Sequence, residues 1–298
     1  MCEWRKGVAI LHDINSPIII LSAPRAGSTL LFEALSRHPQ LWTIGGESHG
    51  VIEQVPQLST VARGYISNRL TSDDASDEVC NTLKQRFIAN ARSATGSRLP
   101  YAGLSHLRFL EKTPKNALRV SFLHSVFPDA KFIYLVRDPR PNISSIMQAW
   151  QSRRFMTYPD LPGWPGGWSL LLPDGWKNQL GNSLAEIAAF QWQAANSAIA
   201  QSLNKLNNDQ FFTVNYDSFV EDPSAVLKSI LTFAGLDLAP MEKMVQNNAL
   251  PLSRYTLSPP DTQKWRINAK EILPQMDNLR DTIKDINVHL AQTDTLAL

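Results

Sequence analysis

The strongest constraint on the fold of this chain is an apolar run that leads directly into a glycine-containing turn and a second apolar pattern. Residues 17–22, Pro-Ile-Ile-Ile-Leu-Ser, are nearly all apolar and β-branched, which is typical of a strand buried inside a sheet. After the turn at 23–29, apolar residues recur with helical spacing over 30–35. A helix that begins at Gly27-Ser28-Thr29 points several backbone N–H groups at one place, so we expect an anionic, phosphorylated ligand there.

Composition limits the class of protein. The chain has 298 residues, of which 43% are hydrophobic and 19% charged, and this is enough to bury a core as one domain over residues 1–298. The net charge of +2 gives no global basic field, so we expect no nucleic-acid partner. Two cysteines, Cys2 and Cys80, are too few for a disulfide framework.

The sequence contains no pattern that predicts a membrane span. The apolar run near the N-terminus is cut short by His12 and Asp13, and no stretch approaches the roughly 20 apolar residues that cross a bilayer. We therefore expect a cytoplasmic protein without a transmembrane segment or an export signal, and the sequence leaves its oligomeric state open.

The opening unit is repeated further along the chain. Residues 131–136 form a second apolar run, followed by Arg137-Asp138-Pro139-Arg140 and a helical pattern that continues to Trp150. Strands are also expected at 41–44, 107–112 and 211–216, and helices at 78–94, 116–126, 183–206 and 223–234. This alternation predicts an α/β fold, a P-loop-like, doubly wound parallel sheet flanked by helices, with its site at the carboxyl ends of the strands.

A loop insertion rich in tryptophan, glycine and proline interrupts this alternation at residues 155–180. Three tryptophans, Trp164, Trp168 and Trp176, argue against disorder. With Phe155 and Tyr158 they can form a lid or acceptor-site loop over an apolar or sugar substrate, because tryptophan combines a large apolar face with one donor. Alternatively, the rings pin a long connection to the core.

The turn at 23–29 departs from the P-loop of nucleoside triphosphate enzymes. Ser22 and Ser28 stand where that motif needs a glycine and a lysine, which disfavours ordinary ATP chemistry. Arg25 lies inside the turn instead, where its planar donors can clamp a terminal anionic group. A kinase or nucleotide hydrolase using ATP, and a non-catalytic nucleotide-binding module, stay as alternatives.

The motifs resemble those of sulfotransferases that use 3′-phosphoadenosine-5′-phosphosulfate (PAPS), closest in style to the bacterial, tyrosylprotein and carbohydrate branches. Residues 24–31, Pro-Arg-Ala-Gly-Ser-Thr-Leu-Leu, resemble the family's 5′-phosphosulfate loop, and Arg137-Asp138-Pro139-Arg140 with Ser145 resembles its 3′-phosphate motif. The spacing lets the Ser145 hydroxyl turn toward the anion that Arg137 binds. The resemblance implies these cofactor-binding residues: Arg25, Ala26, Gly27, Ser28, Thr29, Leu30, Arg137 and Ser145.

Three weaker matches follow in the family's order. Residues 111–114, Glu-Lys-Thr-Pro, are similar to the lysine-bearing motif, residues 215–220 to the strand end that carries Tyr216, and Lys264-Trp265-Arg266 to the late cofactor segment. The resemblance implies that Lys112 offers positive charge to the bridging oxygen and that the other residues bind the cofactor. The alternatives are a solvated Lys112, a core-facing Tyr216 and a packing Trp265.

The loop Gly45-Gly46-Glu47-Ser48-His49 is similar to a loop of tyrosylprotein sulfotransferases that carries the catalytic base. Glu47 aligns with that base, while His49, which titrates near neutrality without special help, is the rival. Alternatively, both side chains only fix the loop by hydrogen bonds.

The resemblance implies in-line transfer of a sulfuryl group from PAPS to a hydroxyl or amine, without a metal, leaving adenosine 3′,5′-bisphosphate. Arg137 and Ser145 would distinguish PAPS from ATP, which has no 3′-phosphate. A near-neutral chain gives no sign of a polyanionic acceptor, so we expect a small-molecule, lipid-like or sugar acceptor rather than a protein tyrosine.

Overall fold

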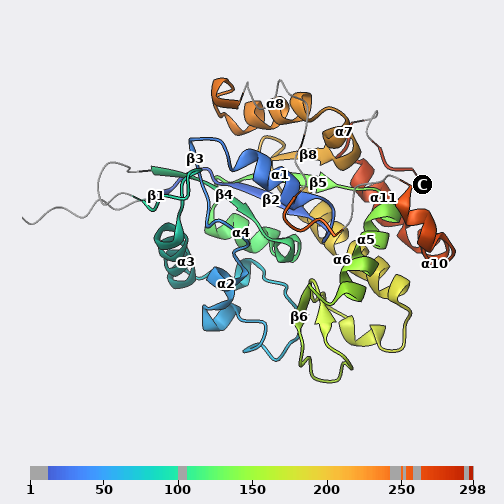
Figure 1. Cartoon of the computed structure of the whole chain (residues 1–298). Coiled ribbons are helices and arrows are strands. Elements are labelled where there is room, and N and C mark those ends of the chain that lie inside the picture. The colour runs from blue at the N-terminus through green and yellow to red at the C-terminus, as the bar shows by residue number, and fades with distance from the viewer. Residues whose placement is uncertain are drawn as a thin grey trace, which may run out of the picture.

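A parallel sheet lies at the centre of the structure (Figure 1), a computed structural model that describes residues 13–99, 106–241, 250, 253–257, 263–291 and 295–297. Six strands within these ranges form the sheet, in the order β1-β4-β2-β5-β8, with β3 also paired to β4. All of these pairings are parallel. The strands are β1 (Asp13–Ile14), β2 (Ile18–Ser22), β3 (Leu41–Trp42), β4 (His106–Lys112), β5 (Lys131–Val136) and β8 (Phe211–Asn215).

Strand β2 is the centre of this sheet because both of its edges are paired and both of its faces are covered. All five of its residues are buried. Ile18 and Ile20 pack into one hydrophobic cluster while Ile19 and Leu21 pack into another, as the two-residue period of a strand requires. The unbroken apolar run therefore reflects burial on two faces.

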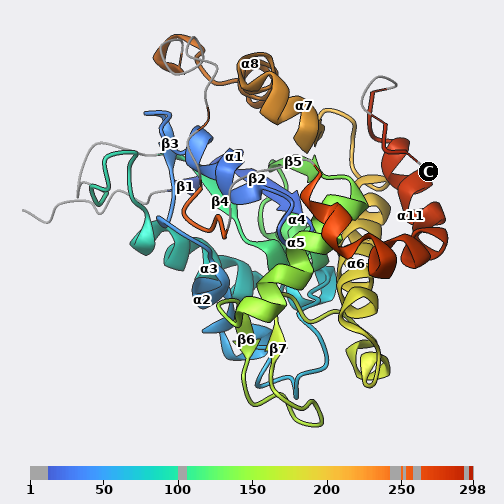
Figure 2. The ribbon, with the colours of Figure 1, turned by 45° about the vertical axis from the view of Figure 1, so that its right-hand side comes forward.

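Helices cover both faces of the sheet, as Figures 1 and 2 show. One hydrophobic cluster joins a face to α1 (Ser28–Leu35), α7 (Tyr216–Glu221) and α8 (Pro223–Ala234). The other joins the opposite face to α3 (Asp77–Asn90), α4 (Val120–Val126), α5 (Pro139–Ser152), α6 (Leu184–Leu203) and α11 (Met276–Asn287). Shorter helices are α2 (His49–Glu53), α10 (Ala269–Ile272), η1 (Pro56–Leu58), η2 (Ser72–Asp74), η3 (Pro114–Leu118), η4 (Trp176–Gln179), η5 (Ala239–Met241), η6 (Lys264–Asn268) and η7 (Leu273–Gln275).

The structure confirms the predicted α/β class and the mostly parallel sheet flanked by helices. Several predicted boundaries were wrong. The helix expected over 116–126 is split into η3 and α4 at Arg119, and the one expected over 78–94 ends at Asn90. Tyr216 begins α7 because Asn215 caps that helix, its side-chain oxygen accepting from the Asp217 N–H at 2.8 Å. Residues 1–12, with Cys2, lie outside the described residues, and the extent of the domain stays a prediction.

None of the helices within the described ranges is both long and apolar enough to cross a membrane.

The insertion at 155–180 has its own small core. It contains an antiparallel pair, β6 (Met156–Tyr158) and β7 (Trp168–Ser169), followed by η4. Trp168 and Trp176 are only 0% and 2% exposed, and their Nε1 atoms donate to the carbonyls of Leu171 and Tyr65 at 2.8 and 2.9 Å. The idea of a tryptophan lid was therefore wrong for these two rings, because they pin the connection to the core.

We predict that Trp168→Ala lowers the free energy of unfolding by about 3–5 kcal/mol, because it empties the middle of this core. The Trp168 ring packs edge-on against Trp150, Trp164 and Trp176, with centroid distances of 5.1, 4.7 and 5.9 Å. Trp164→Ala, which removes a partly buried ring of the same cluster, should cost clearly less. Urea denaturation measures both values, and equal losses would contradict the assignment of Trp168 as the central ring.

Candidate functional site

The candidate site lies where four neighbouring strands of the sheet end. Lys112 is the last residue of β4, Arg25 lies in the turn after β2, Arg137 follows β5 directly, and Tyr216 follows β8 directly. Strands β4, β2, β5 and β8 are adjacent and parallel, so their carboxyl ends meet at one edge. A cavity of about 1,000 Å³ opens there. This is the position at which open α/β sheets bind ligands.

Most of the residues singled out in the sequence line this cavity, and three do not. The lining includes Arg25, Gly27, Ser28, Thr29, Leu30, Glu47, His49, Arg137, Ser145, Tyr216, Lys264 and Trp265. Ala26 is instead buried in the protein interior, and Arg266 is exposed, with its guanidinium 5.5 Å from the Trp265 ring centroid. Lys112 lies behind the lining but contacts two of its residues, Glu47 and Thr29.

The turn after β2 is held in a conformation that only a small residue permits at Gly27. Its φ of +104° lies in the left-handed region, and a Cβ atom there would lie 2.3 Å from Cε2 of Tyr216. The turn is also fixed from α5, since Asn142 Nδ2 donates to the Pro24 carbonyl at 2.8 Å. The backbone N–H groups at the start of α1 are thereby held at the cavity wall.

Two guanidinium groups, those of Arg25 and Arg137, lie at the centre of the site. Arg137 Nη1 donates to the Arg25 carbonyl at 3.2 Å, and each guanidinium lies over an aromatic ring, Arg25 4.6 Å from Phe155 and Arg137 4.5 Å from Tyr216. Burial lowers the pKa of Arg25 to about 10. The positive charge of Arg137 also lowers this pKa, and the negative charge of Glu47 raises it. Burial also lowers the pKa of Arg137, against the acidic groups near it.

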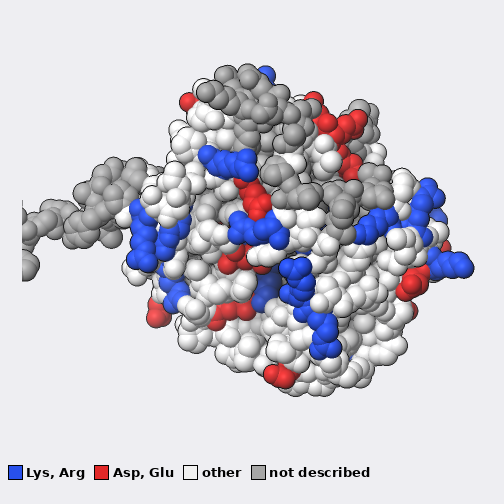
Figure 3. All heavy atoms as spheres, viewed as in Figure 1, with Lys and Arg blue, Asp and Glu red and all other residues white. Residues whose placement is uncertain are grey.

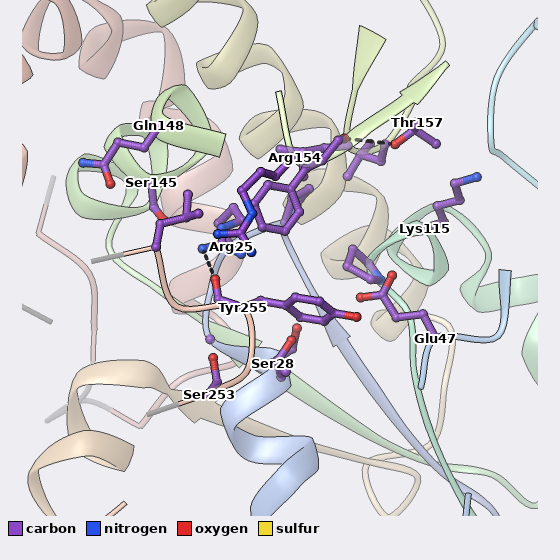
Figure 4. Close-up of a pocket in the computed structure, with 18 of the residues that line it drawn as sticks. Arg25, Ser28, Glu47, Lys115, Ser145, Gln148, Arg154, Thr157, Ser253 and Tyr255 are labelled. Atoms are coloured by element: carbon purple, nitrogen blue, oxygen red, sulfur yellow. Dashed lines mark hydrogen bonds between the residues drawn. The ribbon is translucent and has the colours of Figure 1, made fainter. Parts of the chain in front are cut away.

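Both arginines keep donors that the described residues do not use. The Nε atoms of Arg25 and Arg137 are buried without a hydrogen-bond partner in the described part of the chain. Neither guanidinium forms an ion pair with a described carboxylate, although Arg25 Nη2 donates to the Tyr255 carbonyl at 3.0 Å (Figure 4). Buried donors without partners are costly, so this pair is suited to bind an anion.

Ser145 lies on α5, two turns after Arg137. Helix α5 begins at Pro139, and its N-cap Asp138 accepts from the Arg140 N–H at 2.9 Å. Ser144, Ser145 and Gln148 line the cavity from this helix, and the buried Ser144 Oγ also accepts from Asn268 Nδ2 of η6 at 3.1 Å. Figure 4 shows Ser145 on the same side of the cavity as Arg25. The helix thus brings two neighbouring serines to the cavity, one of which is bound to η6.

Glu47 is shared between a lysine and a histidine. Lys112 Nζ lies 2.7 Å from Glu47 Oε1 and donates to Thr29 Oγ1 at 3.1 Å, while His49 Nδ1 lies 3.7 Å from Glu47 Oε2. The solvated Lys112 considered as an alternative was wrong, because its side chain is only 3% exposed. Burial and the charge of Lys115 lower the pKa of His49 below its ordinary value of 6.5, so the imidazole is neutral at pH 7.

Glu111, the neighbour of Lys112 on β4, fixes the loop that carries Glu47 from the opposite side. Its Oε1 accepts from the Ser48 hydroxyl, from Thr113 Oγ1 at 2.7 Å and from Asn116 Nδ2 at 3.0 Å. Burial raises the pKa of Glu111. Lys112 and Glu111 thus point to opposite faces of β4: Lys112 binds Glu47, and Glu111 binds Ser48, the next residue of the same loop.

Sequence reasoning missed two groups of residues at the site. One is the segment 253–257, where Tyr255 lies between Arg25 and Lys112 and where Arg254 Nε bonds Glu33 of α1 at 2.6 Å. The other is a buried network in which Lys115 lies 2.8 Å and Arg119 2.7 Å from Glu53. Neither group has a local sequence signal, because their partners are distant in the chain.

Charge at the site is local rather than spread over the surface. Figure 3 shows basic and acidic side chains side by side over the middle of the visible face, among the described residues. The described Lys112 is paired with Glu47, and Lys115 and Arg119 share Glu53, whereas Arg25 and Arg137 form no ion pair with a described carboxylate. Arg154 and Lys264 also line the cavity.

The fold and the site define a P-loop-like α/β protein with two buried arginines after neighbouring strands. The profile of the sulfotransferase family matches residues 17–240, so the chain belongs to the sulfotransferase family. This confirms the resemblance found in the sequence.

Two named relatives match this chain over part of their own length. Protein-tyrosine sulfotransferase 1 of Rattus norvegicus is 29% identical over 136 residues, 45% of this chain and 34% of the relative. The protein-tyrosine sulfotransferase of Drosophila melanogaster is 24% identical over 256 residues, 83% of this chain and 44% of the relative. The chain thus spans about a third to less than half of the length of these relatives.

A solved structure supports the fold. The mouse sulfotransferase SULT7A1, solved in complex with PAP, is 15% identical, with a TM-score of 0.50 over 95% of this chain and 92% of that one.

We predict that Gly27→Ala weakens binding of adenosine 3′,5′-bisphosphate at least tenfold, because the methyl group must displace Tyr216 and strain the turn. Gly45→Ala is the matched control, since Gly45 has a positive φ of +79° but nothing within 4 Å of the added Cβ. Isothermal titration calorimetry gives both affinities. Equal losses in the two variants would show that backbone strain alone, rather than contact with Tyr216, is responsible.

Proposed function

We propose that this protein transfers a sulfuryl group from PAPS to a hydroxyl or amine group of a small-molecule, lipid-like or sugar acceptor, leaving adenosine 3′,5′-bisphosphate. The observation that carries the proposal is the pair of buried arginines, Arg25 and Arg137, whose Nε donors have no partner in the described residues. They follow two adjacent strands, and a molecule with anionic groups at both of its ends satisfies both.

The residues present fit such a donor. The N–H groups at the start of α1, with Ser28 and Thr29, suit its 5′ end, and Arg137 with Ser145 suits a 3′-phosphate. Lys264 and Trp265 line the same cavity and belong to the cofactor-binding set that the family resemblance implies. When bound, PAPS supplies the sulfuryl group and a stable leaving group.

The chain's own cations would stabilise the transition state. Arg25 is placed to bind the oxygens of the transferred group, and its ring contact with Phe155 keeps the guanidinium at the cavity. Lys112, held by Glu47 and Thr29, would offer positive charge to the oxygen of the breaking bond. We propose this lysine role on the family's motif order and on these contacts.

Glu47 is the proposed general base. Its Oε1 is bound to Lys112, so Oε2 is the oxygen that would take the acceptor proton. His49 is the alternative, because it lines the cavity and its lowered pKa keeps it able to accept a proton at pH 7. The 3.7 Å between His49 Nδ1 and Glu47 Oε2 also suits a role in which His49 passes the proton to solvent.

Other acceptors and other activities are the alternatives to this proposal. The names of the tyrosylprotein relatives suggest a protein tyrosine as acceptor. An ATP-dependent kinase or hydrolase lacks the lysine of the nucleoside triphosphate loop, for which Ser28 stands here. A non-catalytic nucleotide-binding module would bind the donor product without acceptor-dependent turnover. The cytoplasmic location expected from the sequence stays a prediction.

Nucleotide binding provides the first test. We predict that adenosine 3′,5′-bisphosphate binds at least tenfold more tightly than ATP, and that Arg137→Ala removes this preference by weakening the bisphosphate about 10- to 100-fold. Arg140→Ala is the matched control, because Arg140 belongs to the same motif but pairs with Asp138 and lies outside the cavity lining. ATP binding as tight as that of the bisphosphate would exclude the proposed donor.

The pH profile of turnover distinguishes the two candidate bases. We predict that Glu47→Gln lowers kcat by about 10²- to 10⁴-fold at pH 7 with little change in bisphosphate affinity, and that His49→Ala lowers it less than tenfold. If His49 were the base, wild-type activity would fall as the pH drops through its lowered pKa, below 6.5, and His49→Ala would cause the larger loss. That order of effects would contradict the assignment of Glu47.

A further inference from the structure

We infer that the half of the cavity beyond Arg25 is an apolar subsite for an uncharged, hydrophobic alcohol, and that Tyr65 and Leu170 determine this specificity. The inference rests on the proposed sulfuryl transfer and narrows its acceptor. It gives the insertion a role in acceptor binding. Strand β6 and the residues next to it, rather than the buried tryptophans, form the wall of this half of the cavity.

Continuous contacts lead from the anion site to this wall. The Arg25 guanidinium lies 4.6 Å from the Phe155 ring, and the Phe155 carbonyl accepts from the Leu170 N–H at 3.0 Å. Further along β6, the Tyr158 ring packs edge-on against Tyr65, with a centroid distance of 5.9 Å. The apolar lining of this half consists of Val61, Tyr65, Pro114, Phe155, Met156, Tyr158, Pro159, Leu170 and Leu171. An acceptor in this half would therefore lie beside the transferred group.

The buried charged residues of the wall bind one another, with two cations on one carboxylate. Lys115 Nζ lies 2.8 and 3.0 Å from the two oxygens of Glu53 and 3.0 Å from Tyr158 Oη, and Arg119 lies 2.7 Å from Glu53. Although burial acts to raise it, the charges of Lys115 and Arg119 hold the pKa of Glu53 below its ordinary value. Lys115 and Glu53 belong to the cavity lining, but their charged atoms bind each other, and the Lys115 side chain is only 9% exposed.

At the edge of the same half, apolar side chains reach the surface. Val61 and Ile66, on either side of Tyr65 in the chain, are 56% and 67% exposed. The charged lining residues of β6 and its flanks, Arg154 and Asp160, are of opposite sign and both exposed. Val61 is also a lining residue, so the apolar lining of the cavity continues to the surface at this point.

Backbone conformation gives independent support. Tyr65 and Leu170 have φ angles of +57° and +65°, in the left-handed region that large residues rarely adopt. Both are lining residues of the same cavity half. Strain of this kind persists where the placement of a side chain is required for function, and here two large side chains are held at one wall.

This chemistry favours an apolar alcohol over the other acceptors. A sugar would leave hydroxyls facing apolar groups, and an acidic peptide would bring its carboxylates against this apolar lining and against the carboxylates of Glu53 and Asp160. In the reaction, the alcohol oxygen bonds to sulfur while the bond between sulfur and the 5′-phosphate oxygen breaks, and the alcohol proton goes to Glu47.

The experiment measures kcat/KM with PAPS for primary alcohols from ethanol to hexanol, and for glucose and an acidic tyrosine-containing peptide. We expect kcat/KM to rise about fourfold for each added methylene, the ratio typical of burying that group. Glucose and the peptide should be poorer acceptors than hexanol. Leu170→Gly and Tyr65→Gly should flatten the dependence on chain length, with unchanged affinity for adenosine 3′,5′-bisphosphate.

The variants are chosen so that misfolding does not decide the result, because glycine adopts both φ angles without strain. Ser16→Gly is the matched control, since Ser16 has a positive φ of +46° and does not line the cavity. Bisphosphate binding with preferred sulfation of glucose or the peptide, or with no alcohol sulfated, would overturn the apolar subsite alone. Failure to bind the bisphosphate would instead overturn the proposed function, and the subsite with it.

Discussion

The site depends on the proximity of two positively charged guanidinium groups that form no ion pair with a described carboxylate. Arg25 and Arg137 repel each other, and burial adds to this cost by removing water from both. Aromatic rings and two backbone carbonyls, those of Arg25 and Tyr255, compensate only in part, since the Nε atoms keep no partner in the described residues. An anion bound by both guanidinium groups, as the proposed function requires, would offset this cost, and such an arrangement is a form of preorganisation.

The parts of this arrangement that sequence reasoning predicted are local. Strand β2, its turn and α1 lie within about twenty residues, and Arg137 and Ser145 are separated by two helical turns. Each pattern carries its own geometric consequence, because a strand that ends in a turn and a helix must direct that turn to one edge of the sheet. The parallel sheet then brought the two turns together, since β2 and β5 are neighbours.

The parts that could not be predicted depend on contacts between distant residues. Tyr255 reaches Arg25 across 230 positions, and Lys115 meets Glu53 across 62. Burial of the Trp168 ring, likewise, follows from packing against other tryptophans and not from its own position in the sequence. Composition suggested an aromatic lid because tryptophan serves equally well in a core and in a pocket, and only the packing decides between them.

The distribution of charge also separates the two halves of the cavity. In the proposed donor half, Arg25 and Arg137 form no ion pair with a described carboxylate, whereas Lys112 is bound to Glu47, and Lys115 of the other half is bound to Glu53. A polyanion placed in the second half would meet the carboxylates of Glu53 and Asp160 as well as the paired Lys115. Under the proposed function, the site would bind a highly charged donor and an uncharged acceptor side by side, with Glu47, bound to Lys112 through one oxygen and 3.7 Å from His49 through the other, as the base between them.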